Sequence, residues 1–162
     1  MNIRVITHDD VAAIHATQLA CPQAAQWHVD DYHQLADDPC GMVLTAELAG
    51  ANSREIVGFA AFYRLADQAE VRNLAVAPQH QRRGIARALL QSGISKLADA
   101  GVRRIFLEVR PSNRAALELY ASLGFRLVST RPGYYQDPPE EALVMAFDII
   151  ARSENHGLAK RA

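Results

Sequence analysis

The feature of the sequence that most constrains the fold is one strand–helix–strand–helix succession. A β-rich run at residues 69–77 is followed by residues 82–100, in which apolar side chains recur at helical spacing. Residues 104–110 then predict a strand, and residues 112–123 predict a helix. Two strands joined through a helix lie parallel in a right-handed crossover. We therefore expect the carboxyl ends of both strands at one edge of the sheet, where ligands collect.

Further strands and helices surround this unit, and the sheet is expected to be mixed. The patterns predict strands at 2–6, 42–48, 54–64, 125–130 and 141–148, helices at 9–20 and 27–35, and a turn-rich segment at 131–139. A chain of 162 residues suits one domain, which we place at 1–150. Residues 151–162 show no periodicity and are expected to form a flexible tail.

Composition excludes several classes of function. A net charge of -1 gives no general basic field, so no direct nucleic-acid binding is expected. Cys21 and Cys40 have neither disulfide-framework nor zinc-ligand spacing, and the six histidines are scattered, so no metal is expected. The first residues lack the apolar core of a signal peptide, and no window reaches membrane-spanning length. We therefore expect a cytoplasmic protein without membrane contact.

The segment Gln81-Arg82-Arg83-Gly84-Ile85-Ala86 lies directly between the strand at 69–77 and the long helix. Backbone N–H groups at a helix N-terminus are unpaired and favour anions, and the small Gly84 and Ala86 leave room for a phosphate. Arg82, Arg83 and Arg87 would add charge-assisted bonds. The segment lacks the Gly-Lys-Ser/Thr of a P-loop and the third glycine of a dinucleotide fingerprint. The alternative is an ordinary helix start with a solvated arginine face.

Glu108 is the candidate general base. In the strand at 104–110, alternation places Phe106, Glu108 and Arg110 on one face and the aliphatic residues on the other. A central strand is expected to be buried on both faces, where an ionisable side chain is costly without a partner or a chemical role. An amine must lose a proton before it attacks, and a carboxylate can accept that proton directly or through water. The alternative is an ion pair with Arg110 or a nearby residue.

Asn113 and Tyr120 are two helical turns apart, so they share one helix face with Ala116. That face can line a ligand site. The alternative for Tyr120 is a core position with its hydroxyl hydrogen-bonded.

Taken together, these motifs resemble the GNAT superfamily of N-acetyltransferases. The resemblance rests on the Gln-Arg-Arg-Gly-Ile-Ala turn, on Leu107-Glu108-Val109-Arg110-Pro111-Ser112-Asn113 continuing to Tyr120, and on Gly124-Phe125. Gly133-Tyr134-Tyr135 and residues 141–145 resemble the ribosomal-protein-alanine N-acetyltransferase branch, and the likeness covers roughly residues 1–148. This sequence has Ala86 where many relatives carry glycine, a small change that should be tolerated.

The resemblance implies a mixed, mostly antiparallel α/β sheet with one splayed parallel strand pair and helices on both faces. It places acetyl-CoA between the strands at 69–77 and 104–110, with pantetheine on the main chain of Leu74, Ala75 and Val76 and near Asn113. A main-chain N–H near Val76 would polarise the thioester carbonyl. The pyrophosphate would lie on Arg82, Arg83, Gly84, Ile85, Ala86 and Arg87.

The resemblance also assigns catalysis and acceptor binding. Glu108 is implied as general base and Tyr120 as general acid. Trp27 lies where relatives have an acceptor-side loop, and Tyr134 and Tyr135 lie in the opposite loop, so they are expected to flank a peptide. Trp27 has the alternative of closing a small core.

Three functions stay open at this stage. The first is acetylation of a protein N-terminus, such as that of a ribosomal protein. The second is acetylation of a polyamine, drug or other small amine, and the third is an acyl-CoA-binding module without catalysis. The presence of both Glu108 and Tyr120 favours an enzyme.

Overall fold

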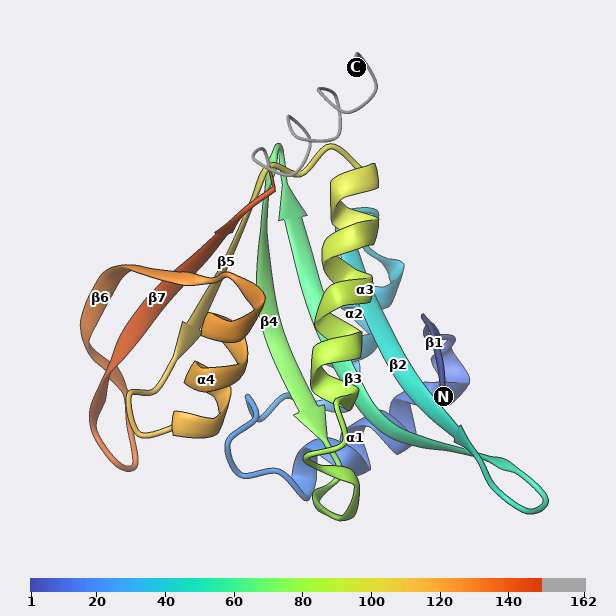
Figure 1. The fold of residues 1–162 in the computed structure, drawn as a ribbon. Coiled ribbons are helices and arrows are strands. Elements are labelled where there is room, and N and C mark those ends of the chain that lie inside the picture. Colours follow the sequence, from blue (N-terminus) through green and yellow to red (C-terminus); the bar gives the residue numbers. More distant parts are fainter. Residues whose placement is uncertain (150–162) are drawn as a thin grey trace.

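The sheet of this protein is mixed and mostly antiparallel. The computed structural model describes residues 1–149, and within them seven strands form one sheet in the order β1-β2-β3-β4-β5-β7-β6 (Figure 1). The strands are β1 (Asn2–Val5), β2 (Gly41–Ala49), β3 (Arg54–Leu65), β4 (Gln68–Val76), β5 (Arg104–Val109), β6 (Arg126–Tyr135) and β7 (Glu140–Asp148). All neighbours in the described sheet are antiparallel except β4 and β5. The predicted fold class is confirmed, whereas the tail predicted at 151–162 lies outside the described residues.

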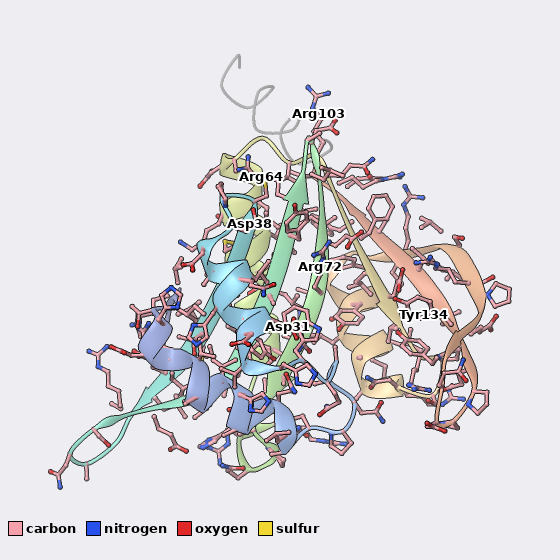
Figure 2. The ribbon with its side chains drawn as sticks, turned by 180° about the vertical axis from the view of Figure 1, so that it is seen from behind. Asp31, Asp38, Arg64, Arg72, Arg103 and Tyr134 are labelled. Carbon is pink, nitrogen blue, oxygen red and sulfur yellow. The ribbon has the colours of Figure 1, made fainter. Side chains whose placement is uncertain are left out.

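Helices cover both faces of the sheet. They are α1 (Val11–Leu19), α2 (Val29–Asp37), α3 (Ile85–Asp99) and α4 (Arg114–Leu123), with short 3-10 turns at His8–Asp10 and Pro78–His80. On one face α3 and α4 contribute Leu89, Leu90 and Tyr120 to the larger apolar core. On the other face α1 and α2 contribute Ile14 and Tyr32 to a second core. Figure 2, which views the molecule from the side opposite to Figure 1, shows this face. No described helix combines the length and the apolar character needed to cross a membrane.

The strands β4 and β5 pair only near their beginnings. Residues Gln68–Val71 lie opposite Arg104–Leu107, and beyond them the strands diverge toward their carboxyl ends (Figure 1). The divergence occurs because β4 stays paired with β3 while β5 stays paired with β7. A register shift leaves Arg72 without a partner on β3, a bulge of the kind often found beside active sites. The predicted parallel pair and its splayed opening are therefore both present.

All four predicted helix starts were two or three residues too early, and two of them bear on the site. The long helix begins at Ile85 rather than at residue 82, because Arg82 and Gly84 have φ values of 62° and 79°, which an α-helix cannot contain. The second helix begins at Val29 rather than at 27. His28 precedes it, and the His28 N–H donates to the Asp31 carboxylate across 2.8 Å, which closes a capping box. Trp27 therefore lies in the loop between α1 and α2.

Strand β6 is longer than predicted. The sequence suggested a strand at 125–130 and turns through 139, but β6 continues to Tyr135, which pairs with Glu140 of β7. A register shift between Arg131 and Tyr135 accommodates Pro132 and Gly133. Tyr134 and Tyr135 therefore end a strand instead of lying in a loop.

Candidate active site

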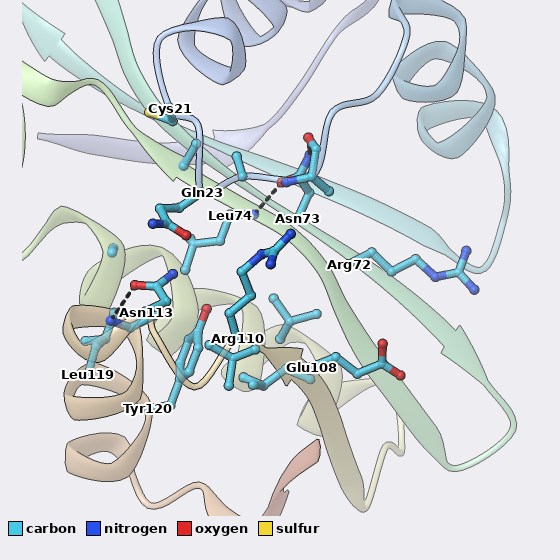
Figure 3. Close-up of a pocket in the computed structure, with 18 of the residues that line it drawn as sticks. Cys21, Gln23, Arg72, Asn73, Leu74, Glu108, Arg110, Asn113, Leu119 and Tyr120 are labelled. Atoms are coloured by element: carbon cyan, nitrogen blue, oxygen red, sulfur yellow. Dashed lines mark hydrogen bonds between the residues drawn. The ribbon is translucent and has the colours of Figure 1, made fainter. Parts of the chain in front are cut away.

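A cavity of about 1530 Å³ occupies the opening between β4 and β5 (Figure 3). Its walls come from the α1–α2 loop, β4, the turn before α3, β5, α4 and β6. All the sequence-predicted site residues except Arg83 line it: Trp27, Leu74, Ala75, Val76, Arg82, Gly84, Ile85, Ala86, Arg87, Glu108, Asn113, Tyr120, Tyr134 and Tyr135. The fold thus brings side chains from six separate segments to one cavity.

The turn at 82–87 has the character of an anion site. Among the described residues, none accepts a hydrogen bond from a backbone N–H of this turn. A Cβ added at Gly84 would meet nothing within 4 Å, so the space beside it is open, although its φ of 79° would strain any other residue. Arg82 and Arg87 reach the cavity wall, and Arg87 also donates to the Ser122 hydroxyl across 2.5 Å. These features fit a pyrophosphate.

The main chain of β4 beside the cavity is partly engaged already. The Leu74 N–H donates to Asn73 Oδ1 across 3.0 Å. The Val76 carbonyl accepts from Gln81 Nε2 at 2.9 Å and from the Cys21 thiol at 3.2 Å. Burial raises the pKa of the Cys21 thiol, so it stays protonated beside that carbonyl. These contacts fix the peptide groups that face the opening.

Glu108 lies on the cavity side of β5, as the alternation predicts, and its side chain is 27% exposed. Its carboxylate accepts from Arg131 Nη1 across 2.6 Å. The pairing with Arg110 that the sequence suggested is not formed, because Arg110 donates instead to Glu140 at 3.1 Å and to the Pro138 carbonyl at 2.8 Å. The nearby ion pair of the alternative interpretation therefore exists, with Arg131 as the partner.

Tyr120 is buried, with only 8% of the residue exposed, and its ring packs against Phe125 at 5.9 Å. Burial raises the pKa of its phenol well above the usual range, so the hydroxyl stays protonated. No described residue donates to or accepts from that hydroxyl. The protonated Tyr120 hydroxyl therefore lies at the cavity wall, where Figure 3 shows the side chain.

Asn113 caps α4 and also faces the cavity. Its Oδ1 accepts from the Ala116 N–H at 3.3 Å, drawn as a dashed line in Figure 3. The amide nitrogen has no hydrogen-bond partner within residues 1–149. The predicted common face of Asn113, Ala116 and Tyr120 does line the cavity, which leaves that nitrogen available to a ligand carbonyl.

The aromatic residues of the acceptor side differ in exposure. Trp27 is half-buried and packs against Tyr32 at 5.1 Å, so it both closes the small core and lines the cavity. Tyr134 is 45% exposed and meets the half-buried Tyr135 edge-on at 4.9 Å. Burial raises the pKa of Tyr135 to about 12. The Arg131 guanidinium lies 4.9 Å from the centre of the Tyr134 ring.

Sequence reasoning missed two polar residues of the site. Arg131 precedes Pro-Gly-Tyr-Tyr, a pattern that predicts a turn. The sequence therefore does not indicate that its side chain contacts Glu108 of β5. Asn73 was missed because β4 also carries the polar residues Gln68, Glu70 and Arg72, so its sequence does not mark Asn73 as the buried one. Within the described chain, His, Cys, Asp and Glu form no group of three that could hold a metal ion.

Comparison with known families gives one match to a family model. The model describes the acetyltransferase (GNAT) family and matches residues 9–125. These residues include helices α1 to α4, strands β2 to β5 and the turn at 82–87.

Several similar proteins carry one name. The [ribosomal protein bS18]-alanine N-acetyltransferase of Escherichia coli is 43% identical over 97 residues, which span 59% of this chain and 66% of the relative. A Bacillus subtilis protein that carries the same name provisionally is 30% identical over 89% of this chain and 91% of its own length. The crystal structure of the Escherichia coli ribosomal-protein-S18-alanine N-acetyltransferase superposes with a TM-score of 0.78 at 32% identity, covering 91% of this chain and 93% of that one.

Proposed function

This chain belongs to the GNAT family of acetyltransferases, and we therefore propose that it moves the acetyl group of acetyl-CoA to the α-amine of a protein N-terminus. The observation that carries the proposal is the continuity of the cavity. One cavity runs past the anion-binding turn at 82–87, the carboxylate of Glu108 and the phenol of Tyr120. Its volume of about 1530 Å³ exceeds that of a usual small-ligand pocket, so an extended donor and an acceptor can both enter.

We assign the donor substrate, acetyl-CoA, to the end of the cavity at α3. The N–H groups of the turn and the guanidinium groups of Arg82 and Arg87 would hold its pyrophosphate. The Asn113 amide nitrogen would donate to a pantetheine carbonyl, and the main chain of Leu74–Val76 would align the arm along β4. A main-chain N–H near Val76 would stabilise negative charge on the thioester oxygen.

We assign the two proton transfers to Glu108 and Tyr120. The Glu108 carboxylate would accept the proton that the amine nitrogen loses as it bonds to the acetyl carbon, directly or through water. The carbon–sulfur bond then breaks, and the Tyr120 hydroxyl would donate its proton to the leaving sulfur. The phenol is protonated at neutral pH, as a proton donor must be. The two groups stand on different walls, β5 and α4, which suits an acid and a base acting at different atoms.

We propose a peptide as the acceptor. The acceptor side is open and aromatic, with Trp27 on one loop and Tyr134 and Tyr135 at the end of β6. Tyr and Trp are enriched at binding interfaces because each combines an apolar ring with a polar group, which suits contact with a peptide. The names of the most similar relatives add support for an N-terminal alanine of a ribosomal protein. A ribosomal acceptor would be met in the cytoplasm, where we place the reaction.

The experiment that tests this proposal is a comparison of acceptors. The protein is mixed with acetyl-CoA and release of CoA is followed with short peptides of different first residue, polyamines and other free amines. The proposal expects turnover with peptides that begin with a small residue. Faster turnover with small amines would replace it by the small-molecule alternative, and binding of acetyl-CoA without turnover of any amine would indicate a non-catalytic module.

A further inference from the structure

A buried polar cluster joins the α1–α2 loop to β4 behind the cavity. Its centre is Asn73, which is 4% exposed. The Asn73 Oδ1 accepts from the N–H groups of Ala25 at 3.1 Å and Leu74 at 3.0 Å, and Figure 3 shows the second of these bonds. Its Nδ2 donates to the Ala25 carbonyl at 3.0 Å and to the Tyr32 hydroxyl at 3.1 Å. A side-chain amide has two donors and two lone pairs, so every hydrogen-bonding position of Asn73 is used.

The cluster continues to a second point on the same loop. The Tyr32 hydroxyl donates to Gln18 Oε1, and the Gln18 Nε2 donates to the Trp27 carbonyl at 3.0 Å. Gln18 is 1% exposed and Tyr32 is fully buried, so water does not compete with these bonds. The loop is therefore held at Ala25 and again at Trp27 by side chains that lie beneath it.

We propose that Asn73 is a positioning residue for acetyl transfer. It ties the wall formed by Ala25 and Trp27, on the acceptor side, to the wall formed by Leu74–Val76, on the donor side, and both walls line the cavity. This inference rests on the proposed function, because it assumes that the amine and the thioester meet between these walls. By fixing their separation, Asn73 sets how the amine approaches the acetyl carbon.

If Asn73 only stabilised the fold, an apolar side chain could do so at a lower cost in free energy. Burial of an amide carries a desolvation cost, which an apolar side chain of similar volume at this position would avoid. The four bonds of Asn73 do not extend a helix or a strand pairing, since three of them reach the α1–α2 loop and Tyr32. Their common consequence is a fixed position for that loop.

The test is a kinetic comparison of Asn73→Leu with a matched control. Thr45→Val also removes a fully buried hydrogen bond, to the Gly58 carbonyl, but Thr45 does not line the cavity. For Asn73→Leu we expect the KM for the peptide acceptor to rise about tenfold or more, and to rise more than the KM for acetyl-CoA. Tyr32→Phe, which removes the hydroxyl between Asn73 and Gln18 but leaves the bonds of Asn73 to Ala25 and Leu74, should raise the acceptor KM less. Thr45→Val should leave both constants unchanged.

A second readout does not depend on activity. Hydrogen exchange of peptides covering residues 20–28 should become faster in Asn73→Leu and Tyr32→Phe but not in Thr45→Val. Unchanged exchange in this loop, or equal KM changes in Asn73→Leu and Thr45→Val, would overturn the positioning role. If the unmodified protein failed to acetylate peptides, the proposed function would fail, whereas faster loop exchange would still support the Asn73 attachment. If Asn73→Leu does not fold, the acceptor KM and the loop exchange of Tyr32→Phe test the proposal instead.

Discussion

Arg131 of β6 donates a hydrogen bond to Glu108 of β5 across 2.6 Å, so the carboxylate that we assign as general base is already held by a cation. The two strands are not neighbours, because β7 lies between them in the sheet. This ion pair raises the pKa of Arg131, and a hydrogen bond to Glu108 raises the pKa of Tyr134. The side chains at the end of β6 are therefore linked to the carboxylate electrostatically.

The first prediction concerns this pair. In Arg131→Gln the carboxylate loses a charge-assisted bond that orients it, so turnover with a peptide should fall about tenfold. Arg131→Lys keeps the charge but not the planar fork and should recover part of the loss. Stability should change little, because the Arg131 side chain is largely exposed. Turnover of Arg131→Gln equal to that of the unmodified protein would show that Glu108 needs no such partner.

The second prediction concerns the base. Glu108→Gln keeps the shape of the side chain but cannot accept the proton, so turnover should fall by about 10²–10⁴-fold. High pH should restore part of the loss because the amine then arrives deprotonated, while affinity for acetyl-CoA should change little. Glu70→Gln is the matched control, since Glu70 also lines the cavity and pairs with an arginine, Arg72, at 3.3 Å. Equal effects of both substitutions on the pH–rate profile would remove the special role of Glu108.

The third prediction concerns the acid. Tyr120→Phe removes only the hydroxyl, so departure of the thiolate should slow and turnover should fall by about 10²-fold. High pH should not rescue this variant. Tyr135→Phe removes another phenol of the cavity and should affect turnover much less. Near-normal turnover in Tyr120→Phe would leave positioning as the main source of catalysis.

The Tyr120 phenol also predicts a pH dependence of stability. Its pKa is raised in the folded state, so above about pH 10 the unfolded chain ionises first and the free energy of unfolding falls. Below about pH 10 the Tyr120 phenol is protonated in both states, so its contribution to the free energy of unfolding is fully present. Tyr120→Phe should therefore lose less stability than the unmodified protein between about pH 10 and 12, as measured by denaturant unfolding.

Most of the fold could be predicted from the sequence because its signals are local. The 3.6-residue spacing of Ile85, Leu89 and Leu90 predicts α3, and the alternation around Glu108 predicts which face it occupies. The start of α3 was missed because a left-handed turn at Arg82 leaves no periodic signal. The partner of Glu108 could not be predicted, because it depends on where the long β6 brings Arg131 in three dimensions.

The same distinction applies to the aromatic residues. Their residue types and turn-rich context suggest a peptide site. The position of Trp27, however, depends on the loop that Asn73 holds, and this long-range attachment has no sequence pattern. Tyr134 and Tyr135 were expected in a loop because Pro132 and Gly133 usually end strands. The strand continues because a register shift absorbs both residues.

The fifth prediction tests where acetyl-CoA binds. Acetyl-CoA should raise the melting temperature of the protein through preferential binding to the folded state, while NAD and ATP should do much less. Gly84→Val should abolish this shift by filling the space beside the turn, with little change in circular dichroism. Gly101→Val is the matched control, because Gly101 also has a positive φ and open space but lies outside the cavity. Loss of the shift in both variants, or in neither, would contradict the assignment.

The central claim is tested most directly by locating the acetyl group on one peptide. The peptide begins with a free alanine α-amine and carries an internal lysine, and tandem mass spectrometry identifies the modified amine after reaction with acetyl-CoA. We expect the acetyl group on the N-terminal nitrogen, with no reaction when that amine is blocked, and a large loss of product in Glu108→Gln. Acetylation of the lysine at an equal or greater rate, or an undiminished rate on the blocked peptide, would contradict the account.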